Sequence, residues 1–141
     1  MRLIYFAVPG RAEASRLALS LSGMEWEDVL VNGETFQKMK ADGELPWGML
    51  PVLESPEGTL AESSAILRYI GKYAGLIPED DYQNAKANEF LDGMGPLARA
   101  LDTTFGLSDA DERIRLRKAL FETGGAGSNN VQILENKVGE S

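Results

Sequence analysis

The first half of the chain alternates short apolar runs with amphipathic stretches. Residues 3–7 form an apolar run that predicts a buried strand, which the Pro9-Gly10 turn ends. Residues 11–22 are rich in Ala, Leu and Arg, which favours a helix, and residues 26–31 predict a second strand. A strand, a helix and a strand in this order predict a βαβ unit, in which the two strands run parallel.

The pattern then changes to a hairpin and a further helix. Residues 34–41 are either a short helix or an irregular segment. After them we expect strands at 49–54 and 59–61, a turn at 56–58 between them, and a helix at 62–70 opened by a serine cap at Ser63. Apolar positions 66, 67, 70 and 74 give this helix a buried face. The order βαβ-α-ββα predicts an α/β sandwich of sheet and helices over residues 1–75.

Only helical patterns follow the linker predicted at residues 76–81. Residues 82–101 have a helix-forming composition, but Gly93, Gly95 and Pro96 should kink or break that helix. We therefore expect two shorter helical pieces in this part of the chain.

The last segment begins with a capped, acid-rich helix start at Ser108, and this helix should run to about residue 123. The stretch 124–130, which is rich in Gly, Ser and Asn, should stop it, and residues 131–138 could add two helical turns. Residues 82–141 thus form the part of the chain where we predict helices alone.

The composition narrows the chemistry, because the 141 residues include no Cys and no His. A disulfide framework, a protein thiol nucleophile, a Ser-His triad and a His/Cys metal site are therefore excluded. Tyr, Ser, carboxylates, Arg and Lys remain, and we expect no metal. Any thiol chemistry must use a thiol that the substrate brings.

The charge and hydropathy of the chain indicate which classes of partner to expect. The chain has 14 basic and 22 acidic residues, a net charge of −8, which argues against nucleic acid as a partner. No apolar run is long enough for a membrane span, so we expect no membrane insertion. The chain enters a strand directly after Met1, and we therefore expect no leader peptide and a cytoplasmic location.

Tyr5 lies near the carboxyl end of the first predicted strand, just ahead of the Pro9-Gly10 turn. Open α/β sheets bind ligands at this edge, so Tyr5 is a candidate for ligand contact. The alternative is a half-buried tyrosine that only packs, and the strand by itself favours packing.

Two dipeptides further along the chain offer backbone groups to a ligand. Leu50-Pro51 precedes the third strand, and its peptide bond is either an ordinary trans bond or a cis bond that exposes the backbone of Leu50. Glu62-Ser63 stands at a helix N-terminus, where Ser63 and free N–H groups could bind a carboxylate. The alternative for Ser63 is a cap alone.

Tyr5-Phe6, Gly10-Arg11-Ala12-Glu13, Leu50-Pro51 and Glu62-Ser63, taken in order, resemble the cytosolic glutathione transferases, and most of all their tyrosine-type, sigma-like members. The resemblance covers residues 2–81 and fades across residues 82–141. It implies a thioredoxin-like N-terminal domain over residues 1–75, followed by an all-α C-terminal domain. Since the family's helical domain is much longer, residues 82–141 would form only an incomplete, partial version of it.

The resemblance also implies roles for these residues. Tyr5 would donate a hydrogen bond to the sulfur of glutathione and favour the thiolate. Leu50, ahead of Pro51, would pair through its backbone with the cysteinyl residue of glutathione. Ser63 and the helix N-terminus would receive the γ-glutamyl carboxylate, and Glu62 the amino group.

Further positions match the family's pattern or depart from it. Arg11 matches an arginine near the active-site tyrosine, and Lys40 resembles the lysine that meets the glycyl carboxylate. Phe36 stands where sigma-like members commonly have Trp, and Met49 where a lysine is common, so both departures should weaken glutathione binding. Ser15, the candidate for a serine-type enzyme, lies a full turn inside the predicted helix and is rejected.

We therefore predict a glutathione transferase with glutathione as co-substrate and a small hydrophobic electrophile as second substrate. The resemblance implies a homodimer or a larger assembly. Two alternatives remain at this point. One is a non-catalytic structural or interaction module within a larger assembly, and the other is a glutathione-dependent isomerase or peroxidase.

Overall fold

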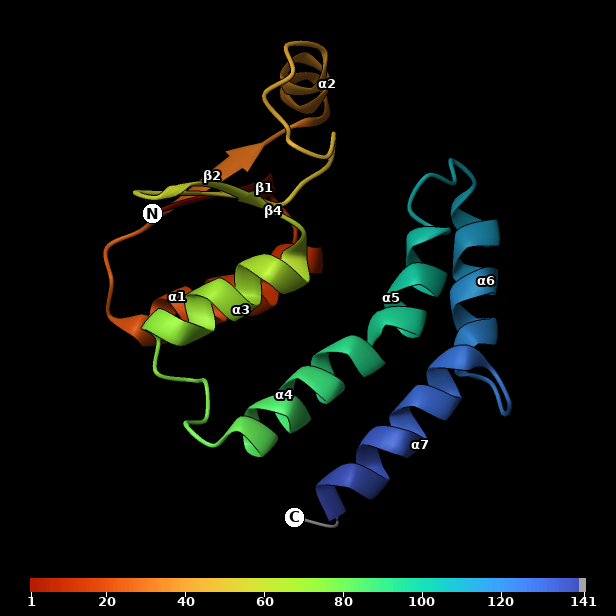
Figure 1. Cartoon of the computed structure of the whole chain (residues 1–141). Helices are drawn as coiled ribbons and strands as arrows, with labels where there is room; N and C mark the ends of the chain where they lie inside the picture. Colours follow the sequence, from red (N-terminus) through yellow and green to blue (C-terminus); the bar gives the residue numbers. More distant parts are fainter. Residues whose placement is uncertain (140–141) are drawn as a thin grey trace. The chain divides into compact units, whose positions relative to one another are not determined.

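The computed structural model describes residues 1–139 and contains a four-stranded mixed sheet (Figure 1). The strands are β1 (Arg2–Phe6), β2 (Glu27–Val31), β3 (Val52–Ser55) and β4 (Gly58–Ala61), in the order β2-β1-β3-β4. β1 runs parallel to β2 and antiparallel to β3, which pairs antiparallel with β4. The parallel pair confirms the predicted βαβ unit, and the sheet with its helices confirms the predicted α/β fold class.

Helices cover both faces of this sheet. They are a short 3₁₀ helix η1 (Gly10–Ala12), α1 (Glu13–Ser22), α2 (Gly33–Ala41) and α3 (Ser63–Tyr73). α1 and α3 pack side by side on one face, and α2 lies on the opposite side (Figure 1). Residues 34–41 are thus helical, because the side chain of Asn32 caps α2 by accepting the Thr35 N–H at 2.8 Å.

The core lies between the sheet and the helix pair α1/α3. Its largest fully buried apolar side chains come from the strands and from the inner faces of the two helices, and they are Leu3, Leu19, Leu53, Ile66 and Ile70. Val52 is also buried, but it pairs with Ile4 and shares the opposite face of the sheet with it. Ile4 lines the cavity beneath α2, of about 320 Å³. Since side chains alternate along a strand, Leu3 and Tyr5 face the other side, that of α1 and α3.

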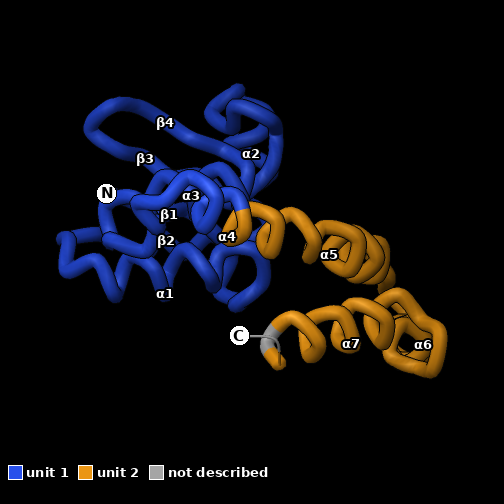
Figure 2. Tube along the Cα trace, turned by 60° about the horizontal axis from the view of Figure 1, so that its bottom comes forward, with its two compact units in different colours: residues 1–85 blue, residues 86–141 orange. Residues whose placement is uncertain are grey.

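The chain divides into two compact units, residues 1–85 and 86–141 (Figure 2). The second unit contains the rest of α4 (Asp81–Gly93), then α5 (Gly95–Asp102), α6 (Ala110–Phe121) and α7 (Ala126–Gly139). The helix breaks at Met94, as the glycines and the proline on either side predict. The last two residues of the predicted 82–141 segment lie outside the described range. No helix within residues 1–139 is long and apolar enough to cross a membrane.

The prediction that residues 124–130 stop the helical pattern is wrong for most of that stretch. Gly124, with φ +84°, makes the turn after α6, but α7 already begins at Ala126. A Cβ at Gly127 would lie 2.7 Å from the ring of Phe121. Glycine is therefore present here because the first turn of α7 approaches the end of α6 closely, and it does not end a helix.

The predicted serine cap of α3 is also wrong. Glu62 is the N-cap residue, and Ser63 is the first helical residue, with no side-chain cap bond to the helix. Glu62 has φ +71° and ψ 112°, the one positive φ of a non-glycine residue in the described chain. The turn from β4 into α3 thus depends on the backbone of Glu62 and leaves the hydroxyl of Ser63 available for other contacts.

Candidate active site

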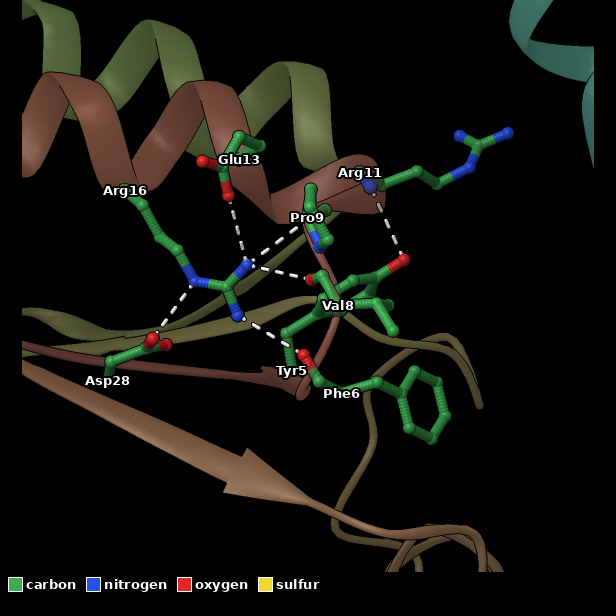
Figure 3. A network of polar contacts seen from close by, with 8 residues as sticks. All are labelled: Tyr5, Phe6, Val8, Pro9, Arg11, Glu13, Arg16 and Asp28. Atoms are coloured by element: carbon green, nitrogen blue, oxygen red, sulfur yellow. Dashed lines mark hydrogen bonds and ion pairs between the residues drawn. The ribbon is translucent and has the colours of Figure 1, made fainter.

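Tyr5 lies at the carboxyl half of β1, and its side chain is 8% exposed. Its hydroxyl oxygen accepts the backbone N–H of Arg11 at 3.3 Å (Figure 3). Because the oxygen is the acceptor in this bond, the hydroxyl proton can be donated to a further group. An N–H donated to the same oxygen also strengthens that donation, since linked hydrogen bonds polarise one another.

Gly10 allows this close approach. It has φ +46°, a conformation that favours glycine, and a Cβ there would lie 2.8 Å from the Tyr5 hydroxyl oxygen and 3.1 Å from Tyr5 Cε1. The sequence identified Gly10 only as a turn residue. In the structure the same glycine also makes room for the hydroxyl, and so brings the Arg11 N–H within reach of it.

The Leu50-Pro51 peptide bond is cis, which confirms that alternative. Both residues are buried, and they lead directly into β3. Antiparallel pairing of Ile4 with Val52 brings the segment just ahead of β3 alongside the carboxyl end of β1, where Tyr5 lies. Two of the predicted site segments therefore meet at one edge of the sheet.

Glu62 and Ser63 come to the same edge from β4. Val52 pairs with Ala61, so the residues that follow Ala61 lie beside the start of β3. Ser63 begins α3, and the first N–H groups of a helix have no partner within that helix. A helix N-terminus therefore stands at this edge together with the cis dipeptide and Tyr5, and it can receive an anion.

Two side chains of α2, Phe36 and Lys40, lie near the sheet edge that carries Tyr5. Phe6, next to Tyr5, meets the ring of Phe36 edge to face, with ring centroids 5.5 Å apart. Lys40 Nζ lies 5.9 Å from the centroid of the Phe36 ring. The exposed Lys40 can thus offer its charge near Phe36, although Phe36 supplies no N–H donor of the kind that a Trp would.

Arg11 contributes its backbone to the Tyr5 hydroxyl and its side chain elsewhere. In Figure 3 the side chain of Arg11 extends away from that hydroxyl. The arginine whose guanidinium does lie over the Tyr5 ring is Arg16, with Cζ 5.8 Å from the ring centroid. Sequence reasoning missed Arg16, although a signal was present. Ala12 and Leu19 are fully buried, and Arg16 shares their face of α1.

The N-terminal half of the chain matches a family profile described as "Glutathione S-transferase, N-terminal domain", over residues 1–72. The chain belongs to the glutathione S-transferase family.

Individual members of the glutathione S-transferase family support this assignment. Glutathione S-transferase 1 of Ascaris suum is 30% identical over 144 residues, which cover 99% of this chain and 68% of that protein. Human glutathione S-transferase P is 33% identical over 95 residues, or 67% of this chain. The chain spans only 45% of the length of the human protein, less than half.

A solved sigma-class glutathione S-transferase of Fasciola hepatica superposes with a TM-score of 0.79 at 25% identity, and the match covers 99% of this chain and 67% of that one. The sigma-like resemblance and the thioredoxin-like fold of the N-terminal half are thereby confirmed.

Two other kinds of site considered from the sequence were a catalytic serine and a metal site. Ser15, the residue expected in a serine-type transferase, is 1% exposed, and its hydroxyl has no hydrogen-bond partner among the described residues. Its burial within the core of the first unit keeps it away from any ligand. Residues 1–139 hold no group of three or more His, Cys, Asp or Glu side chains suited to a metal ion.

Proposed function

We propose that this chain binds glutathione and that the Tyr5 hydroxyl donates a hydrogen bond to the glutathione sulfur. The observation that supports this most is the Tyr5 hydroxyl itself, which accepts the Arg11 N–H at 3.3 Å and keeps its proton for another acceptor. The thiol loses its proton to solvent, and the thiolate attacks an electrophilic carbon. A carbon–sulfur bond forms, and the leaving group departs with its bonding pair.

One hydrogen bond is sufficient for this activation. A free thiol with a pKa of about 8.5 is only about 7% thiolate at a pH of about 7.4. Lowering that pKa by about two units requires roughly 2.7 kcal/mol of selective stabilisation of the thiolate. A hydrogen bond to a charged group contributes about 1.5–3 kcal/mol. Tyr5 can therefore perform the activation without the help of a protein base.

We propose that the rest of glutathione occupies the same sheet edge. The N–H groups at the start of α3 and the Ser63 hydroxyl suit the γ-glutamyl carboxylate. The Glu62 carboxylate suits the amino group. The backbone of Leu50, next to the cis bond, suits the cysteinyl backbone, and Lys40 suits the glycyl carboxylate.

Replacement of Tyr5 by Phe tests the central step. Without the hydroxyl, kcat/KM for conjugation of glutathione to an aryl halide should fall about tenfold to a hundredfold, because one hydrogen bond to the thiolate is lost. The measurement is the rate of product absorbance at saturating glutathione. Tyr82→Phe is the matched control, since Tyr82 is 69% exposed on α4. Equal rates for Tyr5→Phe and the unchanged chain would rule out the role assigned to Tyr5.

A second candidate is a non-catalytic interaction module. Large apolar side chains are half exposed in the second unit, namely Ile114, Phe121, Val131 and Ile133. Exposed apolar faces of this kind commonly bind a partner. This candidate predicts no conjugation with any electrophile and a melting temperature that rises when the partner is added. Conjugation that depends on Tyr5 would exclude it.

We also propose that the chain associates as a homodimer, as its resemblance to the family implies. The mass measured by sedimentation equilibrium should then be twice that of the chain at micromolar concentration. A mass equal to one chain over the whole concentration range would reject the dimer.

A further inference from the structure

Arg16 donates hydrogen bonds to three successive parts of the loop that follows β1. Nη2 donates to the carbonyl of Phe6 at 3.2 Å, and Nη1 donates to the carbonyls of Val8 at 2.9 Å and Pro9 at 3.3 Å (Figure 3). A single guanidinium thus satisfies most of the backbone carbonyls between the strand and the 3₁₀ helix. The carbonyls of Val8 and Pro9 lie between β1 and η1, outside the ladder of the sheet, and Arg16 supplies a donor to both.

Two carboxylates hold the guanidinium in this position. Nε donates to Asp28 on β2 at 3.0 Å, and Nη1 also donates to Glu13 at 3.3 Å. The Arg16 side chain is only 14% exposed, so these contacts are shielded from solvent far more than ordinary surface pairs. The planar fork of five N–H donors allows one residue to make all of these bonds, and a lysine cannot reproduce that geometry.

The loop that Arg16 holds is the segment that places a donor on the Tyr5 hydroxyl. It runs from Phe6 through Pro9 into Gly10, whose Cα faces the hydroxyl, and then to the Arg11 N–H. If the loop moved outward, the Arg11 N–H would leave the phenol oxygen. Two other contacts act on the start of this loop: the Val8 N–H donates to the carbonyl of Phe6 at 2.7 Å, and the Phe6 ring packs edge to face against Phe36. Neither of them involves Pro9 or Gly10.

We propose that Arg16 is a positioning residue for Tyr5: by binding the loop carbonyls, it keeps the Arg11 N–H on the Tyr5 hydroxyl and the hydroxyl in its place for the thiol. The proposal rests on the proposed function for its catalytic consequence. Its structural part, the fixed distance between the Arg11 N–H and the Tyr5 oxygen, can be measured without any substrate.

The first experiment measures amide hydrogen exchange by NMR in the full chain without ligand. In Arg16→Lys and Arg16→Met, the Arg11 amide should exchange about tenfold faster or more, because its hydrogen bond opens locally. The amide of Leu53, in the centre of the sheet, should keep its protection and thus shows that each variant is folded.

The second experiment titrates the thiolate absorbance of glutathione bound to the same proteins. The midpoint should move up by about 1 pH unit in Arg16→Lys, which corresponds to a tenfold weaker preference for the thiolate. In a Tyr5→Phe background, Arg16→Lys should cause no further change, because a residue that acts through Tyr5 has nothing left to position. A merely structural arginine would change the amount of folded protein and leave the midpoint in place.

Two matched controls separate the loop contacts from ordinary ion pairing. Arg2→Met removes a guanidinium that bonds Glu27 at 2.8 Å and Glu54 at 2.6 Å in the same unit but lies away from the loop. It should leave both the Arg11 amide exchange and the thiolate midpoint unchanged. Asp28→Asn weakens the hold on Arg16 while the arginine keeps its carbonyl bonds, so its effects should have the same direction as those of Arg16→Lys and be smaller.

The outcomes distinguish the two proposals. Continued protection of the Arg11 amide in both Arg16 variants overturns the positioning role, and so does an unchanged thiolate midpoint. If glutathione bound to the unchanged chain shows no thiolate absorbance at any pH below the pKa of the free thiol, the proposed function fails. The exchange measurement alone then decides whether Arg16 positions Tyr5.

Discussion

At the scale of single residues, the proposed activation of the thiol depends on how closely the backbone approaches the phenol oxygen of Tyr5. The oxygen of Tyr5 lies against Gly10 on one side and receives the Arg11 N–H there. A residue of any other type at position 10 would meet both a steric clash and a positive φ. The tyrosine and the glycine therefore form a pair in which a change of either affects the other.

Replacement of Gly10 by Ala should lower the free energy of unfolding by more than the cost of a positive φ alone. The positive φ should cost about 1 kcal/mol of unfolding free energy, and the clash with Tyr5 should add to this and displace the hydroxyl. Conjugation should then fall as it does in Tyr5→Phe. Urea unfolding and aryl halide kinetics measure the two effects.

Gly23→Ala is the matched control for this change, since Gly23 has φ +68° and no atom within 4 Å of its Cβ position. It should show the loss of stability and no loss of activity. If both alanine variants conjugate glutathione equally well, the close approach of Gly10 to the Tyr5 hydroxyl does not affect the activity.

At the scale of elements, the turn between β3 and β4 is tied to α3. Glu57 in that turn accepts hydrogen bonds from the hydroxyls of Tyr69 and Tyr73 on α3. The hydrogen bond from Tyr69 lowers the pKa of Glu57, so its carboxylate stabilises the fold at neutral pH and that contribution is lost on acidification. The hairpin and the helix that carries Ser63 are thereby held together.

The same cluster predicts a dependence of stability on alkaline pH. Interaction with Tyr69, followed by partial burial and by Glu57, raises the pKa of Tyr73 to about 12 from 10.0. Because the folded pKa is above the unfolded one, the contribution is fully present below pH 10 and is lost as the pH rises towards 12. The Tyr73 ring resonances should report this midpoint by NMR.

In Tyr69→Phe the midpoint of Tyr73 should fall back towards that of a free tyrosine, and the unfolding free energy should decline less steeply above pH 10. Tyr82→Phe, which removes a hydroxyl elsewhere, should leave the titration of Tyr73 as it is. A Tyr73 midpoint that is insensitive to Tyr69 would show that the cluster does not form in solution.

Strong local signals sufficed where the physics is local: the apolar strand at Leu3, the turn at Pro9-Gly10 and the break at Gly95-Pro96 are all present. The sequence also allowed the cis bond at Leu50-Pro51, although only as one of two alternatives. Helices and strands therefore followed from propensity and pattern.

What the sequence could not provide depends on contacts between distant residues. Gly127 reads as a helix breaker, yet it lies in α7, and glycine is needed there because the ring of Phe121 occupies the space that a Cβ would fill. Glu62, and not Ser63, is the N-cap residue of α3, and it has a positive φ that local pattern does not predict for a glutamate. The sequence analysis did not single out Arg16, because the loop carbonyls that its guanidinium binds come together only in the folded chain. Each of these features depends on the folded structure around the residue and not on the local sequence pattern.

At the scale of the whole molecule, every residue assigned to glutathione lies in the first compact unit, residues 1–85. The second unit, residues 86–141, has its own helices and its own internal hydrogen bonds, such as that from Asn130 to the carbonyl of Gly93 at 3.1 Å. Glutathione binding should therefore change the two units to very different extents.

Hydrogen exchange with and without glutathione measures this difference. At a ligand concentration of about 100 times Kd, the free energy of unfolding of the binding unit should rise by about 2.7 kcal/mol. The added protection should be concentrated within residues 1–85, above all near Tyr5, Leu50 and Ser63. S-methylglutathione, which has no thiol proton, is a useful companion ligand. Protection gained chiefly in residues 86–141 would contradict the assignment.

The pairing of Ile4 with Val52 and of Val52 with Ala61 has one further consequence. Tyr5 follows Ile4, Leu50-Pro51 precedes Val52, and Glu62-Ser63 follows Ala61, so each site segment adjoins this row. The alignment of the last two segments is therefore set by the number of residues between Ser55 and Gly58. Side chains alternate along a strand, and a single inserted residue that shifted β4 by one step would turn its side chains to the opposite face. Insertions in this hairpin should therefore be tolerated only where the added residues bulge outward, whatever their chemical type.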